Sequence, residues 1–162
     1  MIYLDMDGVI ADFDSWIKDY YPELPHHERF RKAVMEEAVF YKLDQMPNAR
    51  KLIDNVVDFI GITDIEILTS VGTKDPELGK IVASQKQMWL EKQGWGYLKL
   101  NTVTEKKEKA KFAEYKSLLI DDRPGCVEPF REAGGRAILY RDSEINDVLQ
   151  AIEDHVALLF PV

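Results

Sequence analysis

The chain has 162 residues, of which 46% are hydrophobic, and it carries a formal net charge of −8. This length and apolar share are typical of one globular domain with a real hydrophobic core and at most a small insertion. The acidic balance argues against a surface that coats long nucleic acids, because such surfaces carry basic stripes. The single cysteine, Cys126, excludes an internal disulfide and a cysteine-rich zinc site.

Predicted strands and helices alternate along most of the chain. The first strand covers residues 2–4, and apolar residues then recur at helical spacing over 16–20 and 30–40. A third helix is predicted over 46–61, with Pro47 at its start and Gly61 at its end. The later elements are strands at 65–70, 97–103, 117–122 and 136–140, with helices at 76–96, 106–115, 124–135 and 144–159. This alternation predicts an α/β fold in which helices cover both faces of a parallel sheet.

The first residues and the hydropathy of the chain indicate where in the cell the protein is expected. No stretch approaches the run of apolar residues that spans a bilayer. The first predicted strand follows Met1 directly, which leaves no room for a signal peptide. We therefore expect a cytoplasmic protein without a membrane partner.

Acidic and hydroxyl side chains follow three of the predicted strands at the point where each strand ends. They are Asp5 and Asp7, then Thr69 and Ser70, then Asp121 and Asp122. The carboxyl ends of parallel strands meet at one edge of a sheet, so these side chains are expected to lie close together. Clustered carboxylates repel one another unless a cation lies among them. Oxygen ligands without histidine or cysteine favour Mg²⁺, which we expect between Asp5, Asp7 and Asp121 or Asp122.

A carboxylate at such a site can also act as a nucleophile toward a phosphoryl group and form an aspartyl-phosphate. This chemistry further needs a lysine and a hydroxyl group to hold the phosphoryl oxygens, and an acid to protonate the leaving group. Gly8 permits a sharp turn whose backbone N–H groups can approach the phosphate.

These motifs resemble those of the haloacid dehalogenase (HAD) superfamily of phosphohydrolases. DMDGVIADF resembles its first motif, ILTS at 67–70 its second, and LLIDD at 118–122 its acidic fourth motif. The resemblance covers nearly the whole chain and implies a Rossmann-like HAD fold. It also implies that Asp5 is the nucleophile and a metal ligand, and that Asp7 is the general acid/base, with its backbone carbonyl on Mg²⁺.

The resemblance assigns the remaining site residues as well. It implies that Thr69 or Ser70 binds phosphate and that Asp121 and Asp122 complete the metal site. The third motif of the superfamily is a single lysine, for which the sequence offers Lys106, Lys107, Lys109 and Lys111. Spacing to the acidic pair favours Lys111, with Lys109 second, although each of the four is also typical of a solvated helix face.

A narrower resemblance concerns the segment after the first motif. FYKLDQMPNARKLID at 40–54, together with Lys86, Trp89 and Leu90, resembles segments of the 5'(3')-deoxyribonucleotidases. Residues 14–46 are then expected to form a small helical cap on a core made of residues 1–13 and 47–162.

In that family, aromatic residues form a pocket for the base. The matching positions here are Phe13, Phe40 and Tyr41, with Phe30 and Trp16 as substitutes for a second aromatic pair. Stacking on an aromatic ring stabilises a bound base by about 1–3 kcal/mol. The alternative for Phe40 and Tyr41 is packing of the cap on the core.

The expected function is that of a Mg²⁺-dependent phosphomonoesterase that acts on (deoxy)nucleoside 5'-monophosphates through an aspartyl-phosphate. One alternative substrate is a sugar phosphate or a phosphorylated nucleic-acid end. Another alternative is a HAD-like binding protein without catalysis. Family members often dimerise, and the apolar residues Val156, Leu158, Leu159 and Phe160 are candidates for a homodimer contact or for the core.

Overall fold

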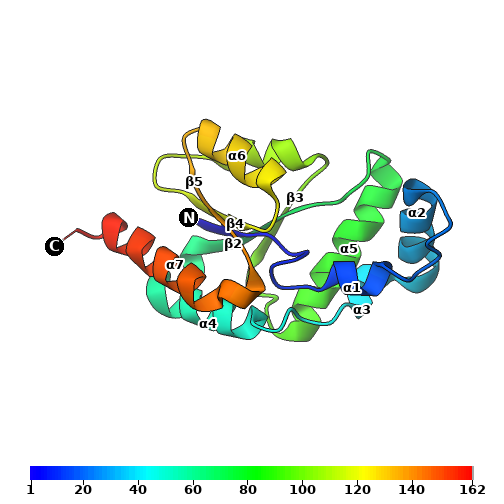
Figure 1. Ribbon diagram of the computed structural model, residues 1–162, viewed down its shortest axis with the longest axis horizontal. Helices are drawn as coiled ribbons and strands as arrows, with labels where there is room; N and C mark the ends of the chain where they lie inside the picture. Colours follow the sequence, from blue (N-terminus) through cyan, green and yellow to red (C-terminus); the bar gives the residue numbers. More distant parts are fainter. Residues whose placement is uncertain (162) are drawn as a thin grey trace.

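The computed structural model describes residues 1–161 as a parallel sheet between two layers of helices (Figure 1). The strands are β1 (Ile2–Leu4), β2 (Ile65–Ser70), β3 (Lys99–Val103), β4 (Leu118–Asp121) and β5 (Arg136–Leu139). They lie in the order β3-β2-β1-β4-β5, and every neighbouring pair is parallel. The predicted α/β fold with helices on both faces of a parallel sheet is confirmed.

Alternate residues of the strands enter two separate hydrophobic clusters, one on each face of the sheet. In β1, Ile2 and Leu4 join the larger cluster, whereas Tyr3 packs against the smaller one. Helices α4 (Ala49–Ile60), α5 (Pro76–Gln93) and α7 (Ile145–Leu159) contribute to the larger cluster. Helix α6 (Pro124–Glu132) and the 3₁₀ helix η2 (Lys106–Phe112) cover the opposite face. Both faces are therefore buried, as expected for a parallel sheet.

Three short helices follow β1, where the cap is expected. They are α1 (Phe13–Ile17), α2 (His26–Glu37) and α3 (Val39–Lys42), and they lie beside α5 (Figure 1). The single helix predicted over 30–40 is divided, because Ala38 adopts a left-handed conformation with φ of +50°. Buried side chains of these helices belong to the larger hydrophobic cluster together with the sheet. The division into a cap of residues 14–46 and a core stays a prediction.

Several predicted helices end earlier than the sequence indicates, and two of them show the reason. Helix α5 stops at Gln93 because Gly94 takes a left-handed φ of +88° and closes the helix. The segment predicted as a helix over 106–115 is the 3₁₀ helix η2, which ends at Phe112. A 3₁₀ helix has three residues per turn, so side chains three positions apart share a face. Short 3₁₀ helices also occur at η1 (Ile62–Asp64) and η3 (Asp142–Glu144).

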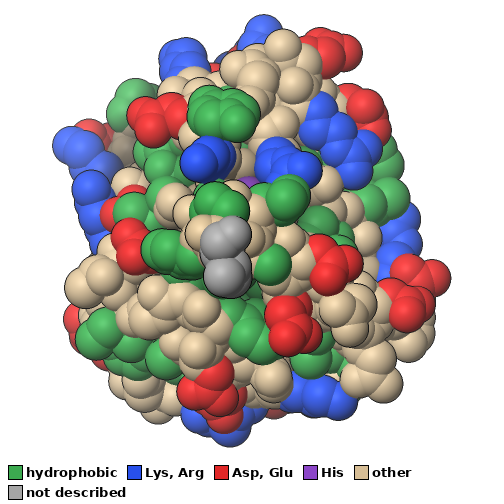
Figure 2. All heavy atoms as spheres, turned by 90° about the vertical axis from the view of Figure 1, so that its left-hand side faces the viewer, with side chains coloured by type: hydrophobic (Ala, Val, Ile, Leu, Met, Phe, Trp, Pro, Cys, Tyr) green, Lys and Arg blue, Asp and Glu red, His purple; other side chains and the backbone are tan. Residues whose placement is uncertain are grey.

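The surface around the end of α7 carries hydrophobic side chains among charged ones (Figure 2). Leu158 and Phe160 are 56% and 66% exposed, whereas Val156 packs against the larger hydrophobic cluster. A homodimer contact through this surface stays a prediction. Within residues 1–161, the helices lack the combination of length and apolar character that is needed to cross a bilayer.

Candidate active site

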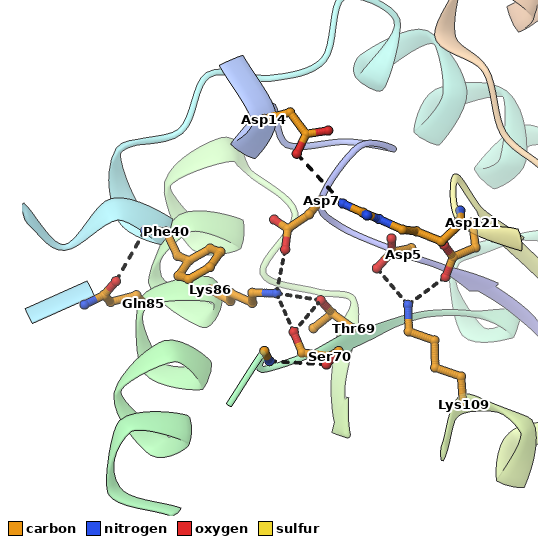
Figure 3. A network of polar contacts seen from close by, with 12 residues as sticks. Asp5, Asp7, Asp14, Phe40, Thr69, Ser70, Gln85, Lys86, Lys109 and Asp121 are labelled. Atoms are coloured by element: carbon orange, nitrogen blue, oxygen red, sulfur yellow. Dashed lines mark hydrogen bonds and ion pairs between the residues drawn. The ribbon is translucent and has the colours of Figure 1, made fainter. Parts of the chain in front are cut away.

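The carboxyl ends of β1, β2 and β4 bring three polar side chains together. Leu4 pairs with Ile67 on one side and with Ile120 on the other, so the three strands reach the same edge of the sheet. Asp5, Thr69 and Asp121 lie at this edge and are buried, with 6%, 1% and 0% of their surface exposed. Buried polar groups of this kind need hydrogen-bonding partners. Two lysines supply them from opposite sides (Figure 3).

Lys109 is the first of these lysines and comes from η2. Its Nζ donates to Oδ1 of Asp5 at 2.9 Å and to Oδ2 of Asp121 at 2.7 Å. Burial by itself would lower the pKa of Lys109, but the two carboxylates outweigh it and raise the pKa above its ordinary value. Lys109 is therefore a charged cross-link between the ends of β1 and β4.

The prediction that Lys111 binds phosphate is wrong. Its side chain is 74% exposed and pairs with Glu108 on the surface of η2. Lys109, the second choice from sequence, occupies the site instead. The reason is the tighter winding of η2, which places Lys106 and Lys109 on the face toward the sheet edge and turns Lys111 to the solvent.

Lys86 is the second lysine and comes from α5. Its Nζ donates to Oδ2 of Asp7 at 3.1 Å, to Oγ1 of Thr69 at 2.6 Å and to the carbonyl of Ser70 at 3.0 Å. The resemblance to the deoxyribonucleotidases includes Lys86 but gives it no role in the site. A signal was present nonetheless, because Lys86 lies on the apolar stripe of α5 formed by Val82 and Leu90, four residues on either side.

Asp122 approaches Asp5 and Asp121 across the turn that contains Gly8. One oxygen from each of these three carboxylates lies within 4.8 Å of the others. A Cβ atom on Gly8, whose φ is +85°, would lie 2.1 Å from Oδ2 of Asp122. Gly8 therefore makes room for the carboxylate. Its own N–H donates to the carbonyl of Ala11 at 2.9 Å, so this group is already engaged, and contact of the turn's N–H groups with phosphate stays a prediction.

A cavity of about 210 Å³ lies over this edge of the sheet. Asp5, Asp7, Thr69 and Ser70 line it together with the aromatic rings of Phe13, Phe30 and Phe40, and with His26, Lys106, Arg123 and Cys126. The cavity thus combines an acidic end with an aromatic wall. The hydroxyl of Ser70 is already engaged, since it donates to the carbonyl of Thr104 at 3.1 Å and accepts from the N–H of Gly72 at 3.2 Å.

The aromatic wall contains two of the three predicted residues. The rings of Phe13 and Phe40 stack on one another, with centroids 5.2 Å apart and planes at 11°. This spacing leaves no room for a third ring between them, so a base would have to pack against the wall. The prediction for Tyr41 is wrong: it is 36% exposed, lies outside the lining of the cavity and carries Lys92 over its ring at 4.2 Å.

Arg123 and Cys126 form the side of the cavity near α6. The backbone N–H of Arg123 donates to Oδ1 of Asp121 at 3.0 Å, while its guanidinium lies 3.8 Å from Asp14. Burial raises the pKa of the Cys126 thiol to about 12. The thiol stays protonated near neutral pH, which does not suit a cysteine nucleophile.

No protein-family model matches the sequence, and no curated protein matches it. Among solved structures, a Mesorhizobium loti protein provisionally named a HAD-like phosphatase matches with a TM-score of 0.56 and 16% identity, over 95% of this chain and 86% of that one. A hydrolase from Streptococcus pneumoniae TIGR4 matches with a TM-score of 0.52 and 14% identity, over 92% of this chain and 97% of that one. The chain has the HAD-like fold. At these identities the likeness concerns the fold alone.

The acidic end of the cavity fits a divalent cation. Four carboxylates meet two lysine ammonium groups there, so full ionisation of the carboxylates leaves two negative charges to be balanced. Oδ1 of Asp122 is buried and has no hydrogen-bond partner within residues 1–161. Burial, together with the charges of Asp5 and Asp121, raises the pKa of Asp122 to about 7. An all-oxygen donor set of this kind suits a hard ion such as Mg²⁺.

In metal-free protein, Asp122 is expected to make the free energy of unfolding fall as pH rises from about 4 to about 7. Over this range the folded state keeps the proton, because the pKa of Asp122 rises from 3.8 to about 7, whereas the unfolded state has lost it. Raising the pH therefore favours the state that binds fewer protons, the unfolded one. Urea unfolding in EDTA at about pH 5 and about pH 8 measures the difference.

The control for this prediction is Asp122→Asn, which cannot ionise. The fall in stability between the two pH values should be smaller in this variant than in the original protein. An equal fall in both proteins would assign the pH dependence to other groups.

Proposed function

We propose that the protein is a Mg²⁺-dependent phosphomonoesterase that acts on nucleoside 5'-monophosphates. One observation carries the proposal: a buried carboxylate, Asp5, is held by Lys109 in a cavity that also contains a second acid, Asp7, and the hydroxyl of Thr69. These are the nucleophile, the cation, the acid and the hydroxyl that phosphoryl transfer through an aspartyl-phosphate requires.

In the first step, a carboxylate oxygen of Asp5 attacks phosphorus and forms an oxygen–phosphorus bond. The bond from phosphorus to the nucleoside oxygen breaks, and this oxygen takes a proton from Asp7. Burial and the nearby charge of Asp5 raise the pKa of Asp7, against the lowering effect of Lys86. A raised pKa suits a carboxyl group that must deliver a proton near neutral pH.

In the second step, water attacks the phosphorus atom of the aspartyl-phosphate and gives a proton to Asp7. The bond between phosphorus and the oxygen of Asp5 breaks, which releases inorganic phosphate and restores both carboxyl groups. Lys109 stays beside Asp5 throughout and holds this carboxylate in place. Its charge also offsets negative charge that gathers on the phosphoryl group.

The side chains of Asp5, Asp121 and Asp122, with the backbone carbonyl of Asp7, would hold Mg²⁺. When bound, Mg²⁺ neutralises part of the negative charge on the phosphoryl oxygens. The role of this chain is to keep three carboxylates close enough for one ion, with Gly8 providing the space beside Asp122.

The aromatic wall supports a nucleoside as the leaving group. Phe13, Phe30 and Phe40 line the same cavity as Asp5 and Asp7, so a flat base can pack on rings while its phosphate reaches the acids. Such packing contributes about 1–3 kcal/mol and reads little of the base's identity. We expect the protein to act on these small substrates in the cytoplasm.

The test is phosphate release from ribo- and deoxyribonucleoside 5'-monophosphates and from sugar phosphates, with Mg²⁺ and with EDTA. The proposal requires release from the nucleotides and its loss in EDTA. Release from sugar phosphates alone would keep the phosphatase chemistry and remove the role of Phe13, Phe30 and Phe40 in base binding. No release from any substrate, together with retained binding of nucleotides, would favour a HAD-like binding protein.

A further inference from the structure

Lys86 carries a buried charge at a point where two of the proposed functional groups meet. Its side chain has no exposed surface, and Asp7 is its only ion-pair partner within residues 1–161. A buried ammonium group is unfavourable unless it is paired and hydrogen-bonded. We propose that Lys86 is a positioning residue that sets the direction of the hydrogen bonds of Thr69 and Asp7 toward the substrate. This inference rests on the proposed function.

The first step of the argument concerns the Thr69 hydroxyl. A lysine ammonium donates hydrogen bonds and cannot accept them, so Oγ1 of Thr69 is the acceptor in its 2.6 Å contact with Lys86. The hydrogen of the Thr69 hydroxyl must then point elsewhere. In the structure this hydroxyl donates to the backbone carbonyl of Ser70 at 3.5 Å, the upper limit of a hydrogen bond, while Lys86 donates to the same carbonyl at 3.0 Å. A phosphoryl oxygen in the cavity that Thr69 lines can replace this long contact with a shorter and stronger one.

The second step concerns the two oxygens of Asp7. Oδ2 accepts from Lys86 at 3.1 Å, whereas Oδ1 is buried and has no hydrogen-bond partner in the part of the chain that the structure describes. Lys86 thus fixes one oxygen and leaves the other free for the leaving group. Without Lys86, the carboxyl group would lose the contact that orients it, and either oxygen could turn away from the cavity.

The third step concerns how Lys86 is itself held. The neighbouring Gln85 accepts from the N–H of Phe40 at 3.3 Å and donates to the carbonyl of Val34 at 3.0 Å, which ties α5 to the helices after β1 (Figure 3). The ring of Phe40 lies 4.8 Å from Nζ of Lys86 and adds a cation–π contact. Lys80 is an exposed lysine of the same helix that pairs with Glu77 on the surface, so it offers a matched control.

The experiment compares Lys86→Met, Thr69→Val, their double variant and the control Lys80→Met on two substrates. One is a deoxynucleoside 5'-monophosphate, whose alkoxide leaving group needs a proton. The other is 4-nitrophenyl phosphate, whose leaving group needs little protonation. In Lys86→Met we expect kcat/KM to fall about 10³-fold for the nucleotide and about 10-fold for the aryl ester, since general-acid catalysis matters for the first substrate only.

The double variant separates positioning from simple loss of packing. If Lys86 acts through Thr69, then Thr69→Val should add little to the loss already caused by Lys86→Met, because the two changes remove one interaction. Lys80→Met removes an exposed lysine and should change neither kcat/KM value nor the ratio between the two substrates. Equal losses on both substrates in Lys86→Met, or fully additive losses in the double variant, would overturn the proposal.

Two further measurements keep the test decisive. If Lys86→Met does not fold, Lys86→Arg retains the buried charge and should show the same change in substrate ratio, because a planar guanidinium does not reach the three acceptors in the same geometry.

If the original protein hydrolyses neither substrate, the proposed function fails. Lys86 is then tested by inorganic phosphate binding in a calorimeter, where Lys86→Met and the double variant should weaken binding equally. Unequal weakening, or no binding by the original protein, overturns the proposal.

Discussion

Asp5→Asn should reduce phosphate release by about 10⁴-fold or more while the protein keeps its fold. An asparagine amide cannot form the acyl phosphate that a carboxylate forms, so the proposed first step is lost. The substitution changes the size of the side chain little, and Asp5 lies in a buried position where shape matters. Lys109 keeps its contact with Asp121 in this variant, so the buried ammonium group remains paired.

The measurement is phosphate release by the variant and the original protein under the same Mg²⁺ concentration. Thermal unfolding of both proteins controls for loss of fold. When turnover by the original protein is stopped with acid, the peptide that contains Asp5 should carry a phosphoryl group. Turnover by Asp5→Asn at a rate near that of the original protein would exclude a covalent role for this residue.

Lys109→Met should lower the free energy of unfolding of metal-free protein by about 3–5 kcal/mol. The reason is that Asp5 and Asp121 would remain buried beside one another without the cation that now lies between them. Added Mg²⁺ should recover part of the loss, because an ion that binds the folded state alone stabilises it. Urea unfolding in EDTA and in Mg²⁺ measures both quantities.

Lys111→Met is the matched control for this variant. Lys111 lies two residues away in η2, is exposed, and pairs with Glu108 on the surface. Exposed ion pairs contribute about 0–1 kcal/mol, so the control should unfold almost as the original protein does. Equal destabilisation by the two substitutions would contradict the assignment of Lys109 to the site.

The sequence predicts the sheet well because both faces of a parallel strand are buried. Such strands are nearly continuous apolar runs, and polar residues mark where each run ends. IEILTS and SLLIDD show this clearly, and their last residues are those that the fold brings to one edge. The positions of Asp5, Thr69 and Asp121 therefore follow from local pattern and from the geometry of parallel sheets.

The errors arise where side-chain direction depends on details of local geometry. Spacing along the chain favours Lys111, but the 3₁₀ winding of η2 turns Lys109 toward the site instead. Tyr41 follows Phe40 in α3, and consecutive helical residues point about 100° apart, so only one of them reaches the cavity. Lys86 is a different case, because a charged residue on an apolar stripe gains a role only when the tertiary structure supplies its partners.

Lys86 and Gln85, two adjacent residues of α5, both contact Phe40, which limits how this protein can be redesigned. Phe40 contacts Lys86 through its ring and Gln85 through its backbone, so replacing Phe40 to admit a larger ligand would also disturb the lysine beside Asp7. Under the proposed function, we therefore expect substitutions of Phe40 to change substrate preference and catalytic rate together. Phe13 and Phe30 line the same cavity and have no such contact with Lys86 in the described chain. A library that varies these two rings and leaves Phe40 unchanged is the better starting point for altered selectivity.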